Sequence, residues 1–321
     1  MHDPELDRFV PEVEALNDEL RKRPPLSRQF RRGPAGIHEV RQNQDQQLAE
    51  RVDAPGPDRV LDVGVPVRVF ESERPAAVYV SMHGGGWVSG SAAMDDVDSA
   101  RIAKACNVTV LSVDYRLVPE VLWTVVLQDC LEAVRYAVVD GSRELGTDTV
   151  VVGGTSAGAT LAVHALLRLR DDPAVSLDRV AGATLAYGVY DFGRTPSQRS
   201  WNQNLVLDPE YIPVTRSLIF PGLDDEDRRD PEISPLYADL AGLPPAFFSV
   251  GALDPFLDDS LFMAQRWRAA GNEAVLRAYP AAPHSFSRHP TGMAAAHHRD
   301  TEEFVTGVIA ARSSTMRGAE Q

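Results

Sequence analysis

Cysteine is scarce in this chain. Only Cys106 and Cys130 occur among its 321 residues, and no CxxC pair is present. So few cysteines exclude a disulfide framework, and we expect both to be small buried apolar residues. The HExxH zinc motif and the EF-hand calcium loop are also absent, so the sequence predicts neither a metal ion nor another cofactor.

Basic residues are outnumbered by acidic ones. The chain has 32 Lys and Arg against 46 Asp and Glu, a formal net charge of −14. A phosphate backbone would require clustered Lys and Arg, so this balance argues against a nucleic-acid partner. No apolar run is long enough to span a membrane, and the charged N-terminal stretch lacks the apolar segment of a signal peptide. We therefore expect a cytoplasmic protein that binds no membrane.

Strand-like and helix-like runs alternate along most of the chain. Eight runs follow residue 58, and the later ones are separated by amphipathic helical patterns. This alternation predicts an α/β fold with a mostly parallel eight-stranded sheet flanked by helices. The first strands have no helix between them, which predicts an antiparallel edge. The predicted strands are 59–65, 67–72, 76–82, 108–115, 149–154, 181–190, 245–253 and 274–280.

Two segments do not fit this alternation. Residues 1–45 carry apolar residues at helical spacing but too few to form a core of their own, so we expect them to lie on the rest of the chain. Residues 192–228 are rich in proline and aromatic residues and show no strand pattern, which predicts an insertion over an edge or end of the sheet. Residues 46–191 and 229–321 are then the two parts of the α/β core.

The stretch Gly154-Thr155-Ser156-Ala157-Gly158 lies between a predicted strand and a predicted helix. G-x-S-x-G in that context is typical of a nucleophile elbow, a turn so tight that larger side chains at the glycine positions would clash. Ser156 would then expose its Oγ at the helix N-terminus, where the N–H of Ala157 faces developing negative charge. The alternative is an ordinary strand–helix turn with Ser156 as the N-cap.

A glycine run follows the third predicted strand, in the sequence His83-Gly84-Gly85-Gly86-Trp87. Consecutive glycines let backbone N–H groups approach a ligand closely. The spacing matches neither GxxxxGK[ST] nor GxGxxG, which argues against a phosphate cradle, and a merely flexible run is the other alternative. We expect His83 to orient this loop through hydrogen bonds.

A hydroxyl nucleophile needs a base and a group that orients the base. Asp254 directly follows one predicted strand and His284 follows the last one, so both stand at strand ends after the serine. His164, His297 and His298 fall inside predicted helices and fit the role of base less well.

Five motifs, taken together, carry a resemblance to a known family. They are HGGGW (83–87), DYRLVPE (114–120), GTSAG (154–158), DPFLDD (254–259) and HSF (284–286). In this order and approximate spacing they resemble the hormone-sensitive-lipase-like α/β-hydrolases, the bacterial family IV esterases, from about residue 55 to 290. The resemblance implies the α/β-hydrolase fold, with Ser156 as nucleophile, His284 as base and Asp254 as the residue that orients the base.

The same resemblance implies an oxyanion hole formed by the backbone N–H groups of Gly85, Gly86 and Ala157. It also implies a helical cap over the active site, built from an N-terminal segment and an insertion after the sixth strand. Residues 1–45 and 192–228 fall in those places. Relatives with GTSAG often dimerise, so a homodimer is expected.

The chain departs from the family pattern in two places. Leu122 and Thr124 stand where the family usually has prolines, so we expect the following helix to start at a shifted position and Trp123 to be placed differently. Ala281 stands where the family often has glycine, and we expect it to stiffen the loop before His284.

These features predict a carboxylic-ester hydrolase that acts on short-to-medium acyl esters of small molecules through an acyl-enzyme. An amidase or lactonase would use the same residues, and an acyl transferase would need a different acceptor. A non-catalytic small-molecule-binding protein of this fold is a further alternative. Aromatic residues in the predicted cap and catalytic loops suggest an apolar pocket, whose candidate residues are Trp87, Trp201, Tyr211 and Phe286.

Overall fold

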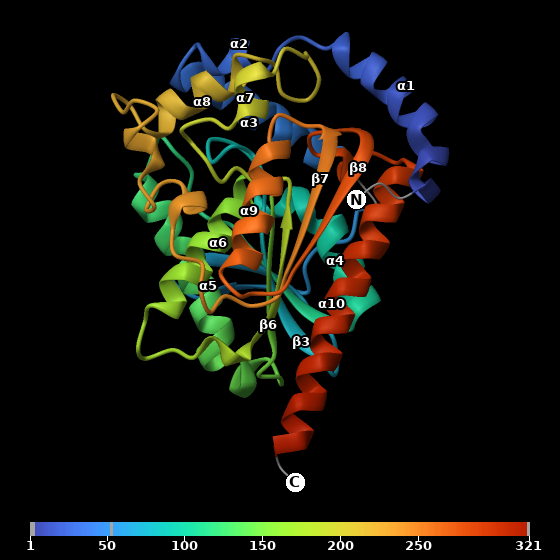
Figure 1. Ribbon diagram of the computed structural model, residues 1–321, viewed down its shortest axis with the longest axis vertical. Helices are drawn as coiled ribbons and strands as arrows, with labels where there is room; N and C mark the ends of the chain where they lie inside the picture. The colour runs from blue at the N-terminus through green and yellow to red at the C-terminus, as the bar shows by residue number, and fades with distance from the viewer. Residues whose placement is uncertain (1–3, 52–53, 320–321) are drawn as a thin grey trace.

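The computed structural model describes residues 4–51 and 54–319, and one eight-stranded sheet runs through its centre (Figure 1). The strand order is β1-β2-β4-β3-β5-β6-β7-β8. Strand β2 is antiparallel to both neighbours, and all pairs from β4 to β8 are parallel. The predicted sheet and its antiparallel edge are therefore confirmed. The strands are Arg59–Asp62 (β1), Pro66–Phe70 (β2), Ala77–Met82 (β3), Val108–Val113 (β4), Val150–Thr155 (β5), Val180–Ala186 (β6), Ala246–Leu253 (β7) and Ala274–Pro283 (β8).

Helices cover both faces of this sheet. Alternate side chains of a strand point to opposite faces, and β5 shows it: Val151 packs in a buried cluster with α4 and α10, whereas Val150 and Val152 pack with α5, α6 and α9. These valines are fully buried, which is why the strand reads as a continuous apolar run. The covering helices are α4 (Asp96–Cys106), α5 (Trp123–Glu144), α6 (Ala157–Arg170), α9 (Leu257–Ala269) and α10 (Gly292–Ala319).

Helix α5 begins inside the segment that departs from the family pattern. Leu122 is the extended residue before the helix, and its side chain is 74% exposed. Trp123, the first helical residue, is buried and packs edge-on against Trp87, with ring centroids 5.5 Å apart. The helix therefore starts on a tryptophan anchored in an aromatic cluster.

Further helices gather at the end of the sheet where Ser156, Asp254 and His284 follow β5, β7 and β8 (top of Figure 1). They come from two distant segments: a 3₁₀ helix (Pro4–Phe9), α1 (Val10–Arg21), α2 (Ser27–Phe30) and α3 (Pro34–Ala49), then α7 (Pro196–Ser200) and α8 (Tyr211–Ile219). The Asp208 carboxylate accepts a hydrogen bond from the N–H of Ser27 at 2.9 Å, and the rings of Phe30 and Tyr211 lie 5.6 Å apart. The two segments therefore pack on each other, and α3 continues past residue 45, to Ala49.

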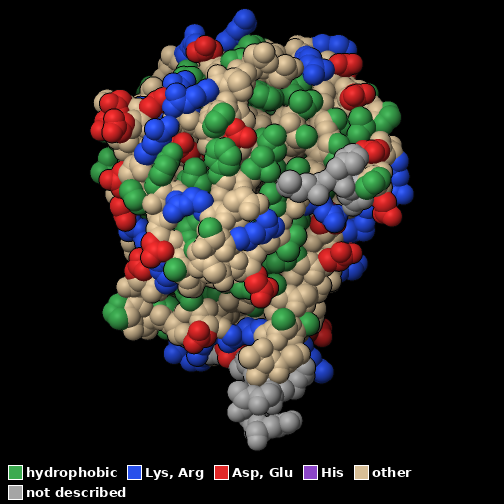
Figure 2. Space-filling view, viewed as in Figure 1, with side chains coloured by type: hydrophobic (Ala, Val, Ile, Leu, Met, Phe, Trp, Pro, Cys, Tyr) green, Lys and Arg blue, Asp and Glu red, His purple; other side chains and the backbone are tan. Residues whose placement is uncertain are grey.

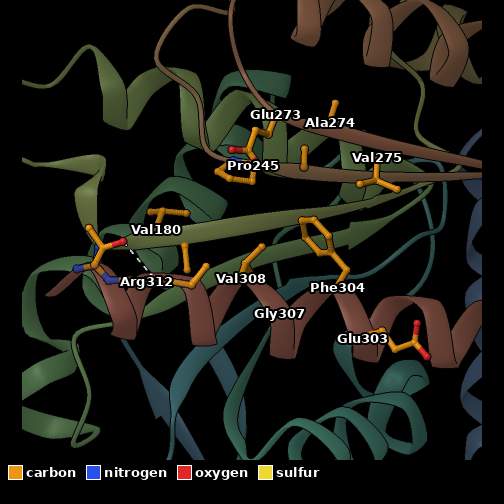
Figure 3. Close-up of a pocket in the computed structure, with 14 residues that line it drawn as sticks. Val180, Pro245, Glu273, Ala274, Val275, Glu303, Phe304, Gly307, Val308 and Arg312 are labelled. Carbon is orange, nitrogen blue, oxygen red and sulfur yellow. Dashed lines mark hydrogen bonds between the residues drawn. The ribbon is translucent and has the colours of Figure 1, made fainter. Parts of the chain in front are cut away.

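The long helix α10 crosses the opposite ends of β6, β7 and β8. A groove of about 560 Å³ lies there. Figure 3 shows Val180, Pro245 and Val275 on one side of it and Phe304 and Val308 of α10 on the other. No serine, cysteine or histidine lines it. On the face seen in Figure 2, acidic and basic side chains are interspersed rather than segregated. Among the described residues, no helix is both long and apolar enough to cross a membrane.

Candidate active site

Ser156 occupies a strained turn between β5 and α6. Its φ of 54° and ψ of −119° are rare for a residue with a side chain. The turn is held by the Ser156 N–H, which donates to the Ala186 carbonyl of β6 at 2.8 Å. A Cβ on Gly154 would lie 2.3 Å from the backbone of Gly158, and one on Gly158 would lie 1.9 Å from the Met82 carbonyl. The predicted need for glycine on both sides of the serine is confirmed.

The Ser156 side chain is not a helix cap. It makes no capping hydrogen bond to α6, although the residue stands at the N-cap position. Its Oγ instead lies 2.8 Å from Nε2 of His284. The alternative of an ordinary strand–helix turn with a capping serine is therefore wrong.

His284 joins the serine to an aspartate. Its Nδ1 lies 2.8 Å from Oδ2 of Asp254, and the other carboxylate oxygen accepts the N–H of Phe256 at 2.8 Å. The rings of Tyr187 and Phe256 meet the imidazole edge-on, with centroids 5.1 and 5.2 Å away. Asp254 follows the last residue of β7 and His284 follows the last residue of β8, so parallel strands deliver both to one end of the sheet.

The glycine loop lies directly beside the serine. A Cβ on Gly84 would lie 3.4 Å from Cβ of Ser156. His83 is buried, its Nδ1 donates to the Gly84 carbonyl at 2.7 Å, and its ring stacks on Tyr115 with centroids 4.1 Å apart. The Tyr115 hydroxyl in turn donates to the His83 carbonyl at 2.7 Å. Burial lowers the pKa of His83, which favours the neutral ring. His83 orients the loop by hydrogen bonds, as predicted.

Backbone donors are available next to Ser156. Gly85 and Gly86 have φ values of 130° and 62°, in the region that favours glycine, and a Cβ on Gly85 would lie 1.9 Å from the Ser89 carbonyl. Within the described chain, the N–H groups of Gly85, Gly86 and Ala157 donate to no protein acceptor. Ala157 is also the first residue of α6, where the helix dipole favours negative charge.

A cavity of about 470 Å³ opens over this arrangement. Ser156, His284, Gly85 and Gly86 form its floor, and the segments that pack at this end of the sheet contribute its walls. Its apolar wall residues are Leu20, Pro24, Leu26, Met94, Leu205, Val206, Leu207 and Tyr211. Helix α3 is fixed above the glycine loop, because Arg41 donates to the Val88 carbonyl at 2.9 Å.

Of the four aromatic residues predicted to contact substrate, only Tyr211 lines this cavity. Its hydroxyl lies next to Gly86, where an added Cβ would meet it at 2.3 Å. Trp87 is buried against Phe192, 5.0 Å between centroids, and Phe286 is buried against Tyr279, 4.8 Å between centroids.

Trp201 donates its indole N–H to the Leu207 carbonyl at 2.9 Å and so ties together the loop that carries Leu207. In the described structure, Trp87, Trp201 and Phe286 thus make packing contacts and do not line the cavity.

Several polar residues of the cavity were not anticipated. They are Arg23, Gln44, Gln47, Arg51, Arg288 and His289. Residues 41–50 (RQNQDQQLAE) look like a solvated helix face in the sequence. Their place at the active site depends on how α3 docks on the core, and no local pattern signals it.

The remaining buried histidines serve other contacts. His164 Nε2 lies 3.3 Å from the Ile233 carbonyl, and His297 Nε2 lies 2.9 Å from Oγ of Ser249. Burial lowers the pKa of His164 to about 4 and that of His297 to about 3. Across residues 4–51 and 54–319, no three His, Cys, Asp or Glu side chains are grouped so that they could hold a metal ion.

Comparison with known proteins gives a consistent result. A family described as the alpha/beta hydrolase fold matches residues 79–288. The carboxylesterase NlhH of Mycobacterium tuberculosis is 32% identical over 246 residues, covering 72% of this chain and 73% of that protein. The esterase LipW from Mycobacterium marinum has a TM-score of 0.80 at 27% identity, over 94% of this chain and 96% of that one.

A hormone-sensitive lipase from a metagenome library has a TM-score of 0.74 at 27% identity, covering 96% of this chain and 99% of that one. The family match spans more than half of the chain, and the likeness to solved structures extends over nearly all of it. The chain therefore belongs to the α/β-hydrolase family, among its hormone-sensitive-lipase-like serine carboxylesterases.

Proposed function

We propose that this protein hydrolyses carboxylic esters of small molecules, with Ser156 as nucleophile, His284 as general base and Asp254 as the residue that orients the imidazole. The observation that carries the proposal is the unbroken chain from Ser156 Oγ to His284 Nε2, 2.8 Å, and from His284 Nδ1 to Asp254 Oδ2, 2.8 Å. These distances are within reach for direct proton transfer.

The reaction proceeds in two halves. Ser156 Oγ attacks the ester carbonyl carbon while His284 Nε2 takes its proton; the bond to the alcohol then breaks, and His284 returns the proton to the leaving oxygen. In the second half, water gives a proton to His284 and attacks the acyl carbon. The bond to Ser156 Oγ breaks, Oγ regains the proton, and the acid departs. Asp254 stays ionised and stabilises the imidazolium.

Each half passes through an oxyanion on the former carbonyl oxygen. We assign its stabilisation to the N–H groups of Gly85, Gly86 and Ala157, which line or adjoin the cavity beside Ser156 and make no hydrogen bond within the described residues. Loss of one such donor costs on the order of 10²–10³ in rate.

We further assign residues 1–45 and 192–228 to a cap that closes the cavity. The contacts between Ser27 and Asp208 and between Phe30 and Tyr211, which join the two segments, support this assignment. A cavity of about 470 Å³ with leucine side chains on its walls suits short-to-medium acyl chains. The cytoplasmic location and the homodimer stay predictions.

The test uses 4-nitrophenyl esters of increasing acyl length. Ser156→Ala is expected to abolish hydrolysis with the fold intact, because no other group replaces Oγ, and Ser314→Ala on the exposed surface of α10 serves as the matched control. Full activity of Ser156→Ala would end the proposal. A marked preference for long chains with interfacial activation would make the protein a lipase.

Matched amide and lactone substrates separate the related activities. An ester turned over faster than its amide and lactone analogues supports the esterase assignment, whereas the reverse order identifies an amidase or lactonase. Failure of a serine-directed organophosphate to label the wild-type protein would favour a non-catalytic binding role.

A further inference from the structure

The cavity that contains Ser156 carries more positive charge than its acids can balance. Arg23, Arg51 and Arg288 line it, and Asp95 is the single carboxylate among its lining residues. The whole chain has a net charge of −14. An excess of arginine at this site is therefore opposite to the bias of the sequence.

One of these arginines is neutralised within the fold. Arg288 pairs with Asp95 and also donates to the Met94 carbonyl at 3.1 Å. The carboxylate of Asp95 holds the pKa of Arg288 above its usual range. This pair forms a fixed part of the wall and leaves no acidic group of the lining unpaired.

The other two arginines remain without a counter-charge. In the part of the chain that the structure describes, neither Arg23 nor Arg51 forms an ion pair, and the side chain of Arg51 makes only a long 3.4 Å hydrogen bond to the Met94 carbonyl. Arg31, which directly follows α2, differs in this respect, because it pairs with Glu210 at 2.6 Å. Arg23 and Arg51 are both exposed, so their guanidiniums lie on the solvent-facing part of the cavity wall.

These positive groups converge with hydrogen-bond donors. Burial lowers the pKa of His289, and the charges of Arg23 and Arg288 lower it further. The guanidiniums of Arg23 and Arg288 therefore both lie near His289 in the cavity wall. Gln44 uses its side-chain oxygen to accept the N–H of Gly90 at 3.0 Å, which leaves its NH₂ group as a donor. The wall therefore offers charge and donors to an anion, beside leucines for an apolar chain.

We propose that this enzyme takes esters whose acyl or alcohol part ends in a carboxylate, and that Arg23 and Arg51 bind that carboxylate while Ser156 attacks the ester. The inference rests on the proposed esterase function and adds the substrate class. Guanidinium suits the task because its planar fork matches a carboxylate with two hydrogen bonds. A cationic mouth also raises the local concentration of anionic substrate.

The test compares kcat/KM for matched ester pairs. Mono-(4-nitrophenyl) glutarate against its neutral methyl ester places the carboxylate on the acyl part, and 4-acetoxybenzoate against methyl 4-acetoxybenzoate places it on the alcohol part. The wild-type protein is expected to prefer the charged member of at least one pair. That preference is expected to shrink as salt screens the arginines.

Two variants assign the preference to residues. Arg23→Gln and Arg51→Gln are each expected to lower the charged-to-neutral ratio of kcat/KM by about fivefold, chiefly through KM, since each removes one charge-assisted contact at a partly solvated site. Arg143→Gln makes the same change on the exposed end of α5, where Arg143 pairs with Asp140 at 3.1 Å, and should leave the ratio at its wild-type value.

The outcomes are distinct. A higher ratio for one pair in wild type, reduced in both cavity variants and kept in Arg143→Gln, supports the inference and tells which part of the ester the arginines bind. Equal rates for charged and neutral esters in wild type, or cavity variants that lower both members alike, overturn the inference and leave the esterase function standing. Absence of hydrolysis of all four esters, with no organophosphate labelling, overturns the esterase function itself.

Discussion

Gly158→Ala places a methyl group where the start of α6, just after Ser156, touches the end of β3. The new Cβ would lie 1.9 Å from the Met82 carbonyl oxygen and 2.7 Å from the His83 carbonyl oxygen, whereas ordinary contact begins near 3.4 Å. Helix α6 and the end of β3 must therefore separate by about 1.5 Å at this point. The atoms concerned are backbone, so no side-chain rotation relieves the clash.

Two opposing effects set the size of the stability change. Alanine in a helix is favoured over glycine by about 0.5–1 kcal/mol, and overpacking of a close contact costs about 1–3 kcal/mol or more. Because the contact is with rigid backbone, the second effect is larger, and the free energy of unfolding is expected to fall by about 1–2 kcal/mol.

The effect on activity is expected to be larger than the effect on stability. Met82 leads directly into the loop of Gly85 and Gly86, so a shift of about 1 Å misplaces the oxyanion donors and lowers kcat on the order of 10²-fold. Urea denaturation and steady-state kinetics on 4-nitrophenyl acetate measure both quantities on the same preparation.

Gly307→Ala is the matched control. Gly307 lies in α10 with open space where its Cβ would be, so the substitution is expected to raise the free energy of unfolding by about 0.5–1 kcal/mol and to leave kcat unchanged. A Gly158→Ala protein as stable and as active as wild type would refute the close contact between the elbow and β3.

Two further predictions concern buried polar groups. Asn17 of α1 is buried and donates to the Ala281 carbonyl at 2.8 Å, so Asn17→Ala leaves that carbonyl without this hydrogen bond. We expect the free energy of unfolding, measured by urea denaturation, to fall by about 1–3 kcal/mol, and kcat to fall as well. No change in either quantity would contradict this role of Asn17. Burial lowers the pKa of His164 to about 4, so the folded state favours the neutral imidazole. The stability that depends on the neutral form is complete above pH 6.5. It is lost as the pH falls toward 4, at about 1.4 kcal/mol of unfolding free energy per pH unit. His164→Gln is therefore expected to show a shallower fall in denaturation midpoint between pH 6.5 and 4. An unchanged slope would show that the pKa of His164 is not lowered in the folded state.

The sheet and the three central residues could be predicted because their signals are local. A valine run ending in glycines predicts both β5 and the tight turn at Ser156, and Asp254 and His284 directly follow strands. Parallel strands carry such residues to a common end, so proximity follows from topology without knowledge of side-chain packing.

The cavity walls could not be predicted in the same way. Trp87 stands next to the glycine loop in sequence, yet its φ of 63° turns it into an aromatic cluster with Phe192. Arg23 and Arg51 reach the site only because the N-terminal helices dock over it. Both outcomes depend on packing between segments far apart in the chain. The sequence pattern around an aromatic or charged residue does not tell whether its side chain will lie in the core, in the cavity wall or on the surface.

Ala281 illustrates an intermediate case. The sequence predicts a stiffer loop where the family often has glycine, and the structure gives Ala281 a φ of 56°, in the left-handed region that glycine adopts more easily. Its carbonyl is held by Asn17, which belongs to a helix more than 250 residues away in the chain. The sequence predicts a stiffer loop, but neither the left-handed backbone of Ala281 nor its contact with Asn17 can be foreseen from it.

The most direct test of the account is the intact mass of the protein during turnover. Mixing with a 4-nitrophenyl ester and quenching in acid should give a species heavier by one acyl group, and proteolysis should place that group on Ser156. The Ser156→Ala protein should gain no mass. Full turnover with no adduct, or an adduct on any other residue, would contradict the claim that Ser156 is the nucleophile.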